Sequence, residues 1–180
     1  MRRLLPLIVF LALAGLLFAG IRLNEQRDPN ALPSPLIGRQ SPGFSLPRLD
    51  DPSLSVQEPE LRGTPYLMNV WGSWCPACRI EHPVVEAIAR AGQVRVIGFN
   101  YKDERGDALR WLGQFGDPYE FSVVDEPGRT AIEWGVYGAP ETFLVDSHGV
   151  VRFKHVGPLT WDLYRQRIVP LLEADTGATP

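Results

Sequence analysis

The chain has 180 residues, enough for one domain of ordinary size with a short appendage. Hydrophobic residues make up 44% and charged residues 22% of the sequence, which is typical of a globular protein and excludes a disordered or fibrous one. The net charge of −3, without a basic tract, argues against nucleic-acid binding. The two cysteines allow at most one internal disulfide and cannot complete a four-thiolate zinc or iron–sulfur site.

The N-terminus predicts a membrane anchor. Arg2 and Arg3 precede an uncharged run over residues 4–21, which as a helix would be about 27 Å long, close to the roughly 30 Å of a bilayer core. With the arginines on the cytoplasmic side, the rest of the chain lies on the far side. A cleaved signal peptide is the alternative, because residues 12–14 (Ala-Leu-Ala) have the form of a cleavage site, although they interrupt the apolar run instead of following it.

The remaining sequence divides into a linker, one domain and a tail. Residues 22–38 are polar and contain several prolines that forbid a continuous helix, so they are predicted to hold the domain away from the membrane. Residues 39–174 show no second linker and no repeat and are predicted to form one domain. Residues 175–180 are predicted to form a flexible tail, and residues 1–21 the anchor with its cytoplasmic tip.

The domain is predicted to be an α/β fold. In chain order, the predicted elements are a strand hairpin at 44–46 and 53–56, a buried strand at 66–71, a helix at 76–91, a strand at 94–99, a helix at 107–115, a strand at 121–124, a short helix at 129–134, a second hairpin at 142–145 and 150–156, and a closing helix at 161–173. This alternation predicts a central mixed sheet flanked by helices, with the last hairpin as an antiparallel edge.

The chemistry is predicted at Cys75 and Cys78, a C-x-x-C pair between a buried strand and a helix. Pro76 suits the first helical position because its missing N–H has no partner there. Cys75 then lies at the helix N-terminus, where the helix dipole and free N–H groups stabilise a thiolate. We expect Cys75 to be accessible and to attack a disulfide, and Cys78, more buried and one turn later, to resolve the mixed disulfide.

Two other uses of this pair are weaker. A structural disulfide across so small a loop would gain little from chain entropy. A metal site would need two more ligands, and the histidines at positions 82, 148 and 155 are scattered along the sequence, with His82 expected on the helix surface. Redox chemistry is therefore the favoured interpretation of the pair.

The sequence around the pair resembles a known family. Residues 74–78 (Trp-Cys-Pro-Ala-Cys) between strand and helix resemble the site of thioredoxin-fold oxidoreductases, and Pro83 and Pro140 match the helix proline and cis-proline of that fold. Four segments are further similar to the DsbE/CcmG family of membrane-anchored thiol:disulfide oxidoreductases of cytochrome c maturation, namely residues 69–76, 79–83, 100–103 and 135–142.

The resemblance implies a thioredoxin-like fold with an N-terminal hairpin extension and a single N-terminal transmembrane helix. It also implies a periplasmic protein disulfide reductase of the bacterial inner membrane. Its client would be apocytochrome c with its C-x-x-C-H motif, or a partner thiol protein, and a DsbD- or CcdA-type membrane protein would return it to the reduced state. No cofactor or metal is expected. A general reductase like TlpA or ResA, with another client, is the alternative function. A copper metallochaperone is more distant, because the Sco type uses C-x-x-x-C.

The resemblance also assigns roles to the residues around the pair. Pro140 would be cis, so that the backbone of Ala139 pairs with an extended client. Asn69 stands where thioredoxins bury an aspartate, and it cannot take a proton from Cys78. Taken alone, Glu81 and Glu141 would be solvated surface charges; the resemblance implies instead that both serve proton transfer at Cys78.

Two neighbours of the cysteines bear on the direction of the reaction. Ala77 places no cation between the cysteines, which favours a reductant over an oxidant. Trp74 is expected to be a hydrophobic platform beside Cys75, although simple packing would also explain it.

Overall fold

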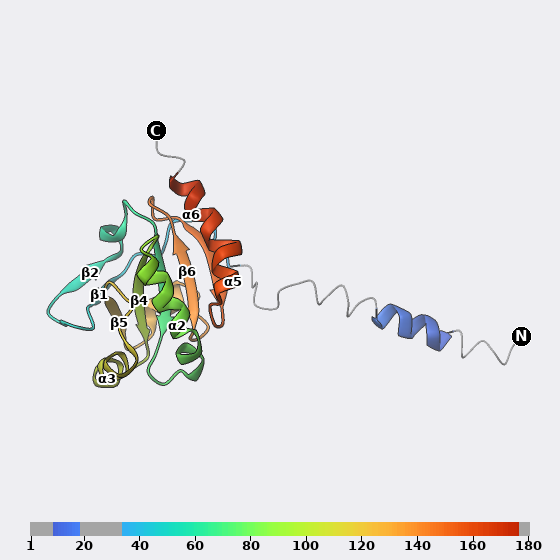
Figure 1. Cartoon of the computed structure of the whole chain (residues 1–180), viewed down its shortest axis with the longest axis horizontal. Coiled ribbons are helices and arrows are strands. Elements are labelled where there is room, and N and C mark those ends of the chain that lie inside the picture. Colours follow the sequence, from blue (N-terminus) through green and yellow to red (C-terminus); the bar gives the residue numbers. More distant parts are fainter. Residues whose placement is uncertain (1–8, 19–33, 177–180) are drawn as a thin grey trace, which may run out of the picture. The chain divides into compact units, whose positions relative to one another are not determined.

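A computed structural model describes residues 9–18 and 34–176 of the chain (Figure 1). Residues 9–18 form a helix with exposed apolar side chains. The rest of the predicted anchor, most of the predicted linker and the end of the predicted tail lie outside the described residues. Within the described ranges, no helix combines the length and the apolar character needed to cross a bilayer.

The centre of the domain is a five-stranded mixed sheet, as predicted. Its spatial order is β5–β4–β3–β6–β7. Strands β3, β4 and β5 run parallel, whereas β6 is antiparallel to β3, and β7 to β6. The strands are β3 (Tyr66–Trp71), β4 (Arg95–Tyr101), β5 (Ser122–Asp125), β6 (Glu141–Val145) and β7 (Val151–Val156).

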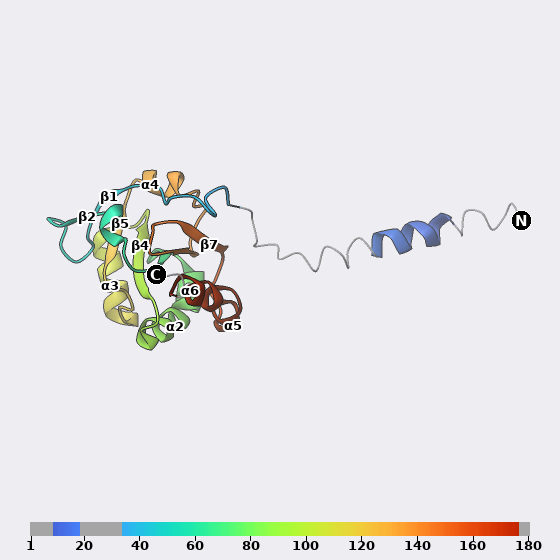
Figure 2. The same cartoon turned by 90° about the horizontal axis from the view of Figure 1, so that it is seen from above.

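Helices cover both faces of the sheet and create two cores (Figure 2). Every residue of β3 is buried, and successive side chains point to opposite faces. Leu67 and Trp71 join the core under α2, α3 and the C-terminal helix, whereas Tyr66, Met68 and Val70 join the core under α4. The helices are α2 (Pro76–Ala91), α3 (Arg105–Phe115), α4 (Arg129–Glu133), α5 (Trp161–Leu163) and α6 (Val169–Thr176).

The N-terminal hairpin is confirmed. Strands β1 (Ser45–Pro47) and β2 (Ser55–Gln57) pair antiparallel, and the short helix η1 (Glu58–Leu61) follows. Arg48 forms a bridge to Val123, so the chain after β1 extends the sheet beyond β5. The hairpin therefore protects an edge strand that would otherwise expose unpaired backbone groups.

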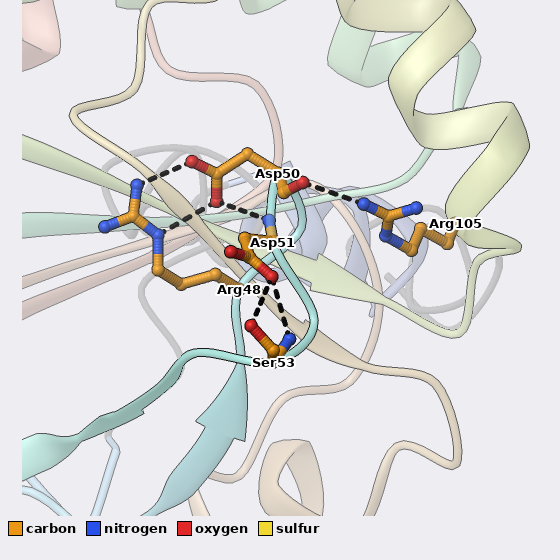
Figure 3. A network of polar contacts seen from close by, with 5 residues as sticks. All are labelled: Arg48, Asp50, Asp51, Ser53 and Arg105. Atoms are coloured by element: carbon orange, nitrogen blue, oxygen red, sulfur yellow. Dashed lines mark hydrogen bonds and ion pairs between the residues drawn. The ribbon is translucent and has the colours of Figure 1, made fainter.

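Polar contacts fix the turn of this hairpin (Figure 3). The Asp51 carboxylate accepts hydrogen bonds from the backbone N–H and the hydroxyl of Ser53, at 3.0 and 2.7 Å. Arg48 donates to both carboxylate oxygens of Asp50, at 2.9 and 2.6 Å. Arg105, the first residue of α3, donates to the Asp50 carbonyl at 2.8 Å and so connects the turn to that helix.

The ends of the domain differ from the prediction in detail. Residues 34–38, expected in the linker, form turns on the domain, and Gly38 N–H donates to the Val151 carbonyl at 2.8 Å. The closing helix continues to Thr176 despite Pro170. A π-helical turn over Tyr164–Ile168 precedes this proline, whose nitrogen has no hydrogen to donate to the preceding turn.

Candidate active site

The two cysteines form the predicted disulfide at the start of α2. Cys75 is the N-cap of this helix, Pro76 is its first residue, and the Cα atoms of Cys75 and Cys78 are 5.3 Å apart. The Cys78 backbone N–H donates to the Cys75 sulfur at 3.1 Å. In the reduced protein, this N–H and the helix dipole would stabilise a Cys75 thiolate.

The cysteines do not differ in burial as expected. Cys75 is 3% exposed and Cys78 is 2% exposed, because both pack into the core under α2. The prediction that Cys75 is the accessible cysteine was therefore wrong with respect to the exposed fraction of its side chain. The two differ in what they face. Cys75, but not Cys78, lines a shallow pocket of about 340 Å³, whose other lining residues are Ser73, Trp74, Pro76, Arg79, Trp111 and Phe115. The pocket therefore distinguishes Cys75 from Cys78, although the two are equally buried.

The loop before Cys75 is held by the segment that follows β4. Asp103 is 6% exposed and accepts hydrogen bonds from the backbone N–H and the hydroxyl of Ser73, both at 2.6 Å. Trp74 donates through Nε1 to the Tyr101 carbonyl at 3.1 Å and remains 50% exposed. These contacts fix Trp74 as an exposed aromatic surface beside Cys75.

Asp103 is a site residue that was not predicted as one from the sequence. A signal was present, because β3 and β4 are adjacent parallel strands in which Trp71 pairs with Asn100. The segments that follow two such strands meet at the same edge of the sheet. Asn100 also donates to Asp103 at 2.9 Å, which orients the carboxylate toward Ser73.

Glu81 is buried, so it is not the solvated surface charge that the residue taken alone predicts. It is 2% exposed; Oε1 accepts from Asn69 Nδ2 at 2.8 Å, and Oε2 accepts from the Leu159 backbone N–H at 2.7 Å. Burial raises the pKa of Glu81 from 4.5 to about 7, and the two hydrogen bonds oppose this rise. A carboxyl group with such a pKa can gain or lose a proton near neutral pH, which suits proton transfer.

Asn69 connects Glu81 to a buried tyrosine. The hydroxyl of Tyr119 donates to Asn69 Oδ1 at 2.8 Å, which turns the amide nitrogen of Asn69 toward Glu81. Glu81 lies one helical turn after Cys78 on the same face of α2. The strand β3 thus orients, through Asn69, a buried carboxyl group of the helix α2 that carries Cys78.

The loop before β6 has the predicted cis peptide bond between Ala139 and Pro140. Glu141 is fully buried, and its Oε1 accepts from the backbone N–H groups of Tyr137 and Gly138 at 2.6 and 3.2 Å. Its Oε2 lies 3.0 Å from Lys154 Nζ, as an ion pair without an aligned hydrogen bond. These contacts tie the Glu141 side chain to the backbone of the loop before β6. Its role in proton transfer at Cys78 stays a prediction.

His82 is not on the helix surface, so that expectation was wrong. It is 4% exposed, donates through Nε2 to the Gly116 carbonyl at 3.1 Å, and packs against the Trp111 ring at 4.6 Å between centroids. His82 follows Cys78 by four residues and precedes Val85 by three, so these three side chains lie on one face of α2. This face packs against the sheet and α3.

Metal-ligating side chains do not gather at the cysteines in the described part of the chain. The group that approaches within 4.8 Å consists of Asp146, His148 and Asp175, at the β6–β7 turn and in α6, and includes neither cysteine. Ala77, half-buried between the cysteines, adds no charge to the site.

Comparisons with known proteins agree with this geometry. The Redoxin family model matches residues 37–168. The chain is 49% identical to a thiol:disulfide interchange protein DsbE of Allochromatium vinosum over 99% of this chain and 97% of the relative, and 45% identical to one of Pseudomonas aeruginosa over 94% and 92%. A crystal structure of a DsbE thiol:disulfide interchange protein from Chlorobium tepidum is similar with a TM-score of 0.63 and 31% identity, over 76% of this chain and 97% of that one.

Proposed function

Because this chain belongs to the Redoxin family and, within it, to the DsbE thiol:disulfide oxidoreductases, we propose that it reduces disulfides during cytochrome c maturation. The client would be apocytochrome c, with its oxidised C-x-x-C-H motif, or a thiol protein of that pathway. The observation that supports reduction over oxidation is the buried Glu81 one turn after Cys78. A carboxylate there disfavours a cysteine thiolate, which makes the reduced protein a better electron donor.

The reaction begins with the dithiol form of the protein. The Cys75 thiolate attacks one sulfur of the client disulfide, and the other client sulfur leaves as a thiolate and takes up a proton. Cys78 then loses its proton, with Glu81 as the acceptor, and attacks the Cys75 sulfur. The client sulfur that was bound to Cys75 leaves as a thiolate and takes up a proton, so both client cysteines are reduced. The two electrons come from the Cys75 and Cys78 thiols, which are oxidised to the disulfide that the structure contains.

The proposal includes the place of the protein in the cell. Residues 4–21 would anchor it in the inner membrane in a single pass, with the N-terminus in the cytoplasm and the catalytic domain in the periplasm. A DsbD- or CcdA-type membrane protein would then return electrons to Cys75. Membrane fractionation of the full chain tests the anchor, with a variant in which Leu11 and Leu13 are replaced by aspartate as the matched control, because two charges in the apolar run should prevent stable insertion.

Trapping of the mixed disulfide tests the client. Cys78→Ser removes the resolving thiol and leaves Cys75 at the helix N-terminus, so the complex with the client should persist under non-reducing conditions. Dithiothreitol should release it, and Cys75→Ser should form none. Apocytochrome c or a thiol protein of its pathway among the trapped partners supports the proposal, whereas only unrelated exported proteins would favour a general reductase. If nothing is trapped, a copper titration of the reduced protein would test the metallochaperone.

A further inference from the structure

The buried lysine of β7 has no role in the thiol chemistry above. The side chain of Lys154 is 3% exposed, although lysine is rarely buried to that extent without partners. Its Nζ donates to the Gly135 carbonyl at 2.6 Å and lies 3.0 Å from Glu141 Oε2. These two partners lie on either side of the cis-proline, because Gly135 precedes it and Glu141 follows it directly as the first residue of β6.

Aromatic rings complete the surroundings of this ammonium group. Lys154 Nζ lies 4.5 Å from the centroid of the Tyr137 ring and 5.2 Å from that of Phe143. A cation over such faces is attracted by their quadrupoles. Tyr137 therefore contacts the buried lysine through its ring and is still 69% exposed to solvent.

Glu141 extends the effect of Lys154 into the loop. One oxygen of the Glu141 carboxylate faces the ammonium group, and the other accepts the backbone N–H groups of Tyr137 and Gly138. Together the lysine and the glutamate bind the loop at one carbonyl and two N–H groups. The next residues in the chain are Ala139 and Pro140, whose backbone is expected to pair with an extended client.

We propose that Lys154 is a positioning residue, which acts through Glu141 and Gly135 to hold the loop over residues 135–140 in the conformation that pairs with a protein client. The inference rests on the proposed reduction of a protein client. Lys154 and Glu141 are both buried and form an ion pair at 3.0 Å, and removing one member of a buried pair leaves the other without its partner at a large cost. Hydrogen bonds that involve a charged group are the stronger ones, so the same ion pair supports the bonds from the Tyr137 and Gly138 N–H groups to Glu141.

The matched variants separate this role from general stability. Lys154→Met keeps much of the length and the apolar stem but removes the charge, and Lys154→Arg keeps a cation. Arg152→Met is the control, because it removes a half-exposed cation from the same strand, one that faces the carboxylate of Asp146 at 3.8 Å. If Lys154→Met fails to fold, the double variant Lys154→Met/Glu141→Gln is used instead, because it also removes the carboxylate that would be left buried without a partner.

Two reactions are compared for each variant. The first is reduction of a synthetic disulfide-bonded peptide with the sequence pattern C-x-x-C-H, which needs the pairing loop. The second is reduction of the Cys75–Cys78 disulfide by dithiothreitol, which does not. For Lys154→Met, or its double variant, we expect the KM for the peptide to rise about tenfold, since hydrogen bonds to charged groups are worth at least that factor. The dithiothreitol reaction should stay within about twofold, and Lys154→Arg should restore most of the peptide KM.

Hydrogen exchange of the Tyr137 and Gly138 amides makes the test independent of the client. These amides should exchange roughly tenfold faster in Lys154→Met, or in its double variant, and at the native rate in Arg152→Met. Unchanged exchange overturns the inference, and so does an equal slowing of the peptide and dithiothreitol reactions. If the unmodified protein does not reduce the peptide, the proposed client class is wrong, and the exchange rates alone decide the role of Lys154.

Discussion

Replacement of Glu81 by glutamine should change how the stability of the protein depends on pH. In the folded protein, burial raises the pKa of Glu81 from 4.5 to about 7. The folded state therefore binds this proton more tightly than the unfolded state does. The favourable contribution is complete below pH 4.5 and is lost as the pH rises through 7.

The size of this effect follows from the shift. A rise from 4.5 to about 7, at 1.36 kcal/mol for each pH unit, amounts to about 3 kcal/mol. Since Glu81 is 2% exposed, solvent screening does not reduce this value much. Glutamine has one carbonyl oxygen where the carboxylate has two acceptors, so one hydrogen bond, from Asn69 or Leu159, is lost at every pH. That loss costs about 1 kcal/mol and does not change with pH.

Urea unfolding of the oxidised protein between pH 4 and 8 measures the effect, because disulfide-bonded cysteines do not titrate. The difference in the free energy of unfolding between Glu81→Gln and the unmodified protein should move in favour of the variant by about 3 kcal/mol as the pH rises. Glu86→Gln, on the same helix, is the control and should follow the unmodified protein. Parallel curves for Glu81→Gln would refute the reasoning, because they would show that folding does not change the pKa of Glu81.

Three further outcomes are expected. Alkylation of the reduced protein against pH should show Cys75 as the more reactive thiol, with a pKa below the usual value of about 8.5; equal labelling of both cysteines would contradict this. Asp103→Ala should release the loop at Ser73 and slow thiol exchange roughly tenfold in stopped-flow measurements, since two hydrogen bonds to a charged group are lost. An unchanged rate would mean that the loop keeps its conformation without Asp103. Tyr119→Phe should raise the pKa of Glu81, because the Asn69 amide, which stabilises the Glu81 carboxylate, loses the hydrogen bond that orients it. The pH at which half of the pH-dependent stability is lost should then move upward, and an unchanged midpoint would exclude this coupling.

The sheet and its helices were predictable because the signals for them are local. The apolar run at 66–71 required a strand buried on both faces, and β3 is buried at every position. The helix predicted at 76–91 ends where expected, because Gly92 follows it in the left-handed conformation, with φ of 65°. The cysteine pair was equally local, since three residues at a helix start define its geometry.

The state of the charged residues could not be predicted in this way. Nothing next to Glu81 in the sequence indicates that it is buried, because its partners lie 12 residues before it, at Asn69, and 78 residues after it, at Leu159. The burial of Lys154 is equally non-local, since its partner Gly135 precedes it by 19 residues and lies in the loop after α4. The family resemblance implied a role for Glu81 and Glu141, but only the fold shows which groups each one meets.

The three carboxylates around the disulfide divide two tasks between them. Each accepts backbone N–H groups from a loop of the site: Asp103 from Ser73, Glu141 from Tyr137 and Gly138, and Glu81 from Leu159. The loops also meet directly, because the Gly157 N–H donates to the Pro140 carbonyl at 2.9 Å.

What separates Glu81 from Glu141 is the counter-charge. Glu141 has Lys154 at 3.0 Å, whereas the hydrogen-bond partners of Glu81 among the described residues are a neutral amide and a backbone N–H. The ion pair with Lys154 fixes the position of the Glu141 carboxylate, which suits a group that keeps a loop in place. A buried carboxyl group without a cation titrates near neutral pH, so it can accept the proton that Cys78 must lose. The same residue type can therefore hold the pairing loop at one position and serve proton transfer at the other, because Lys154 lies beside only one of the two.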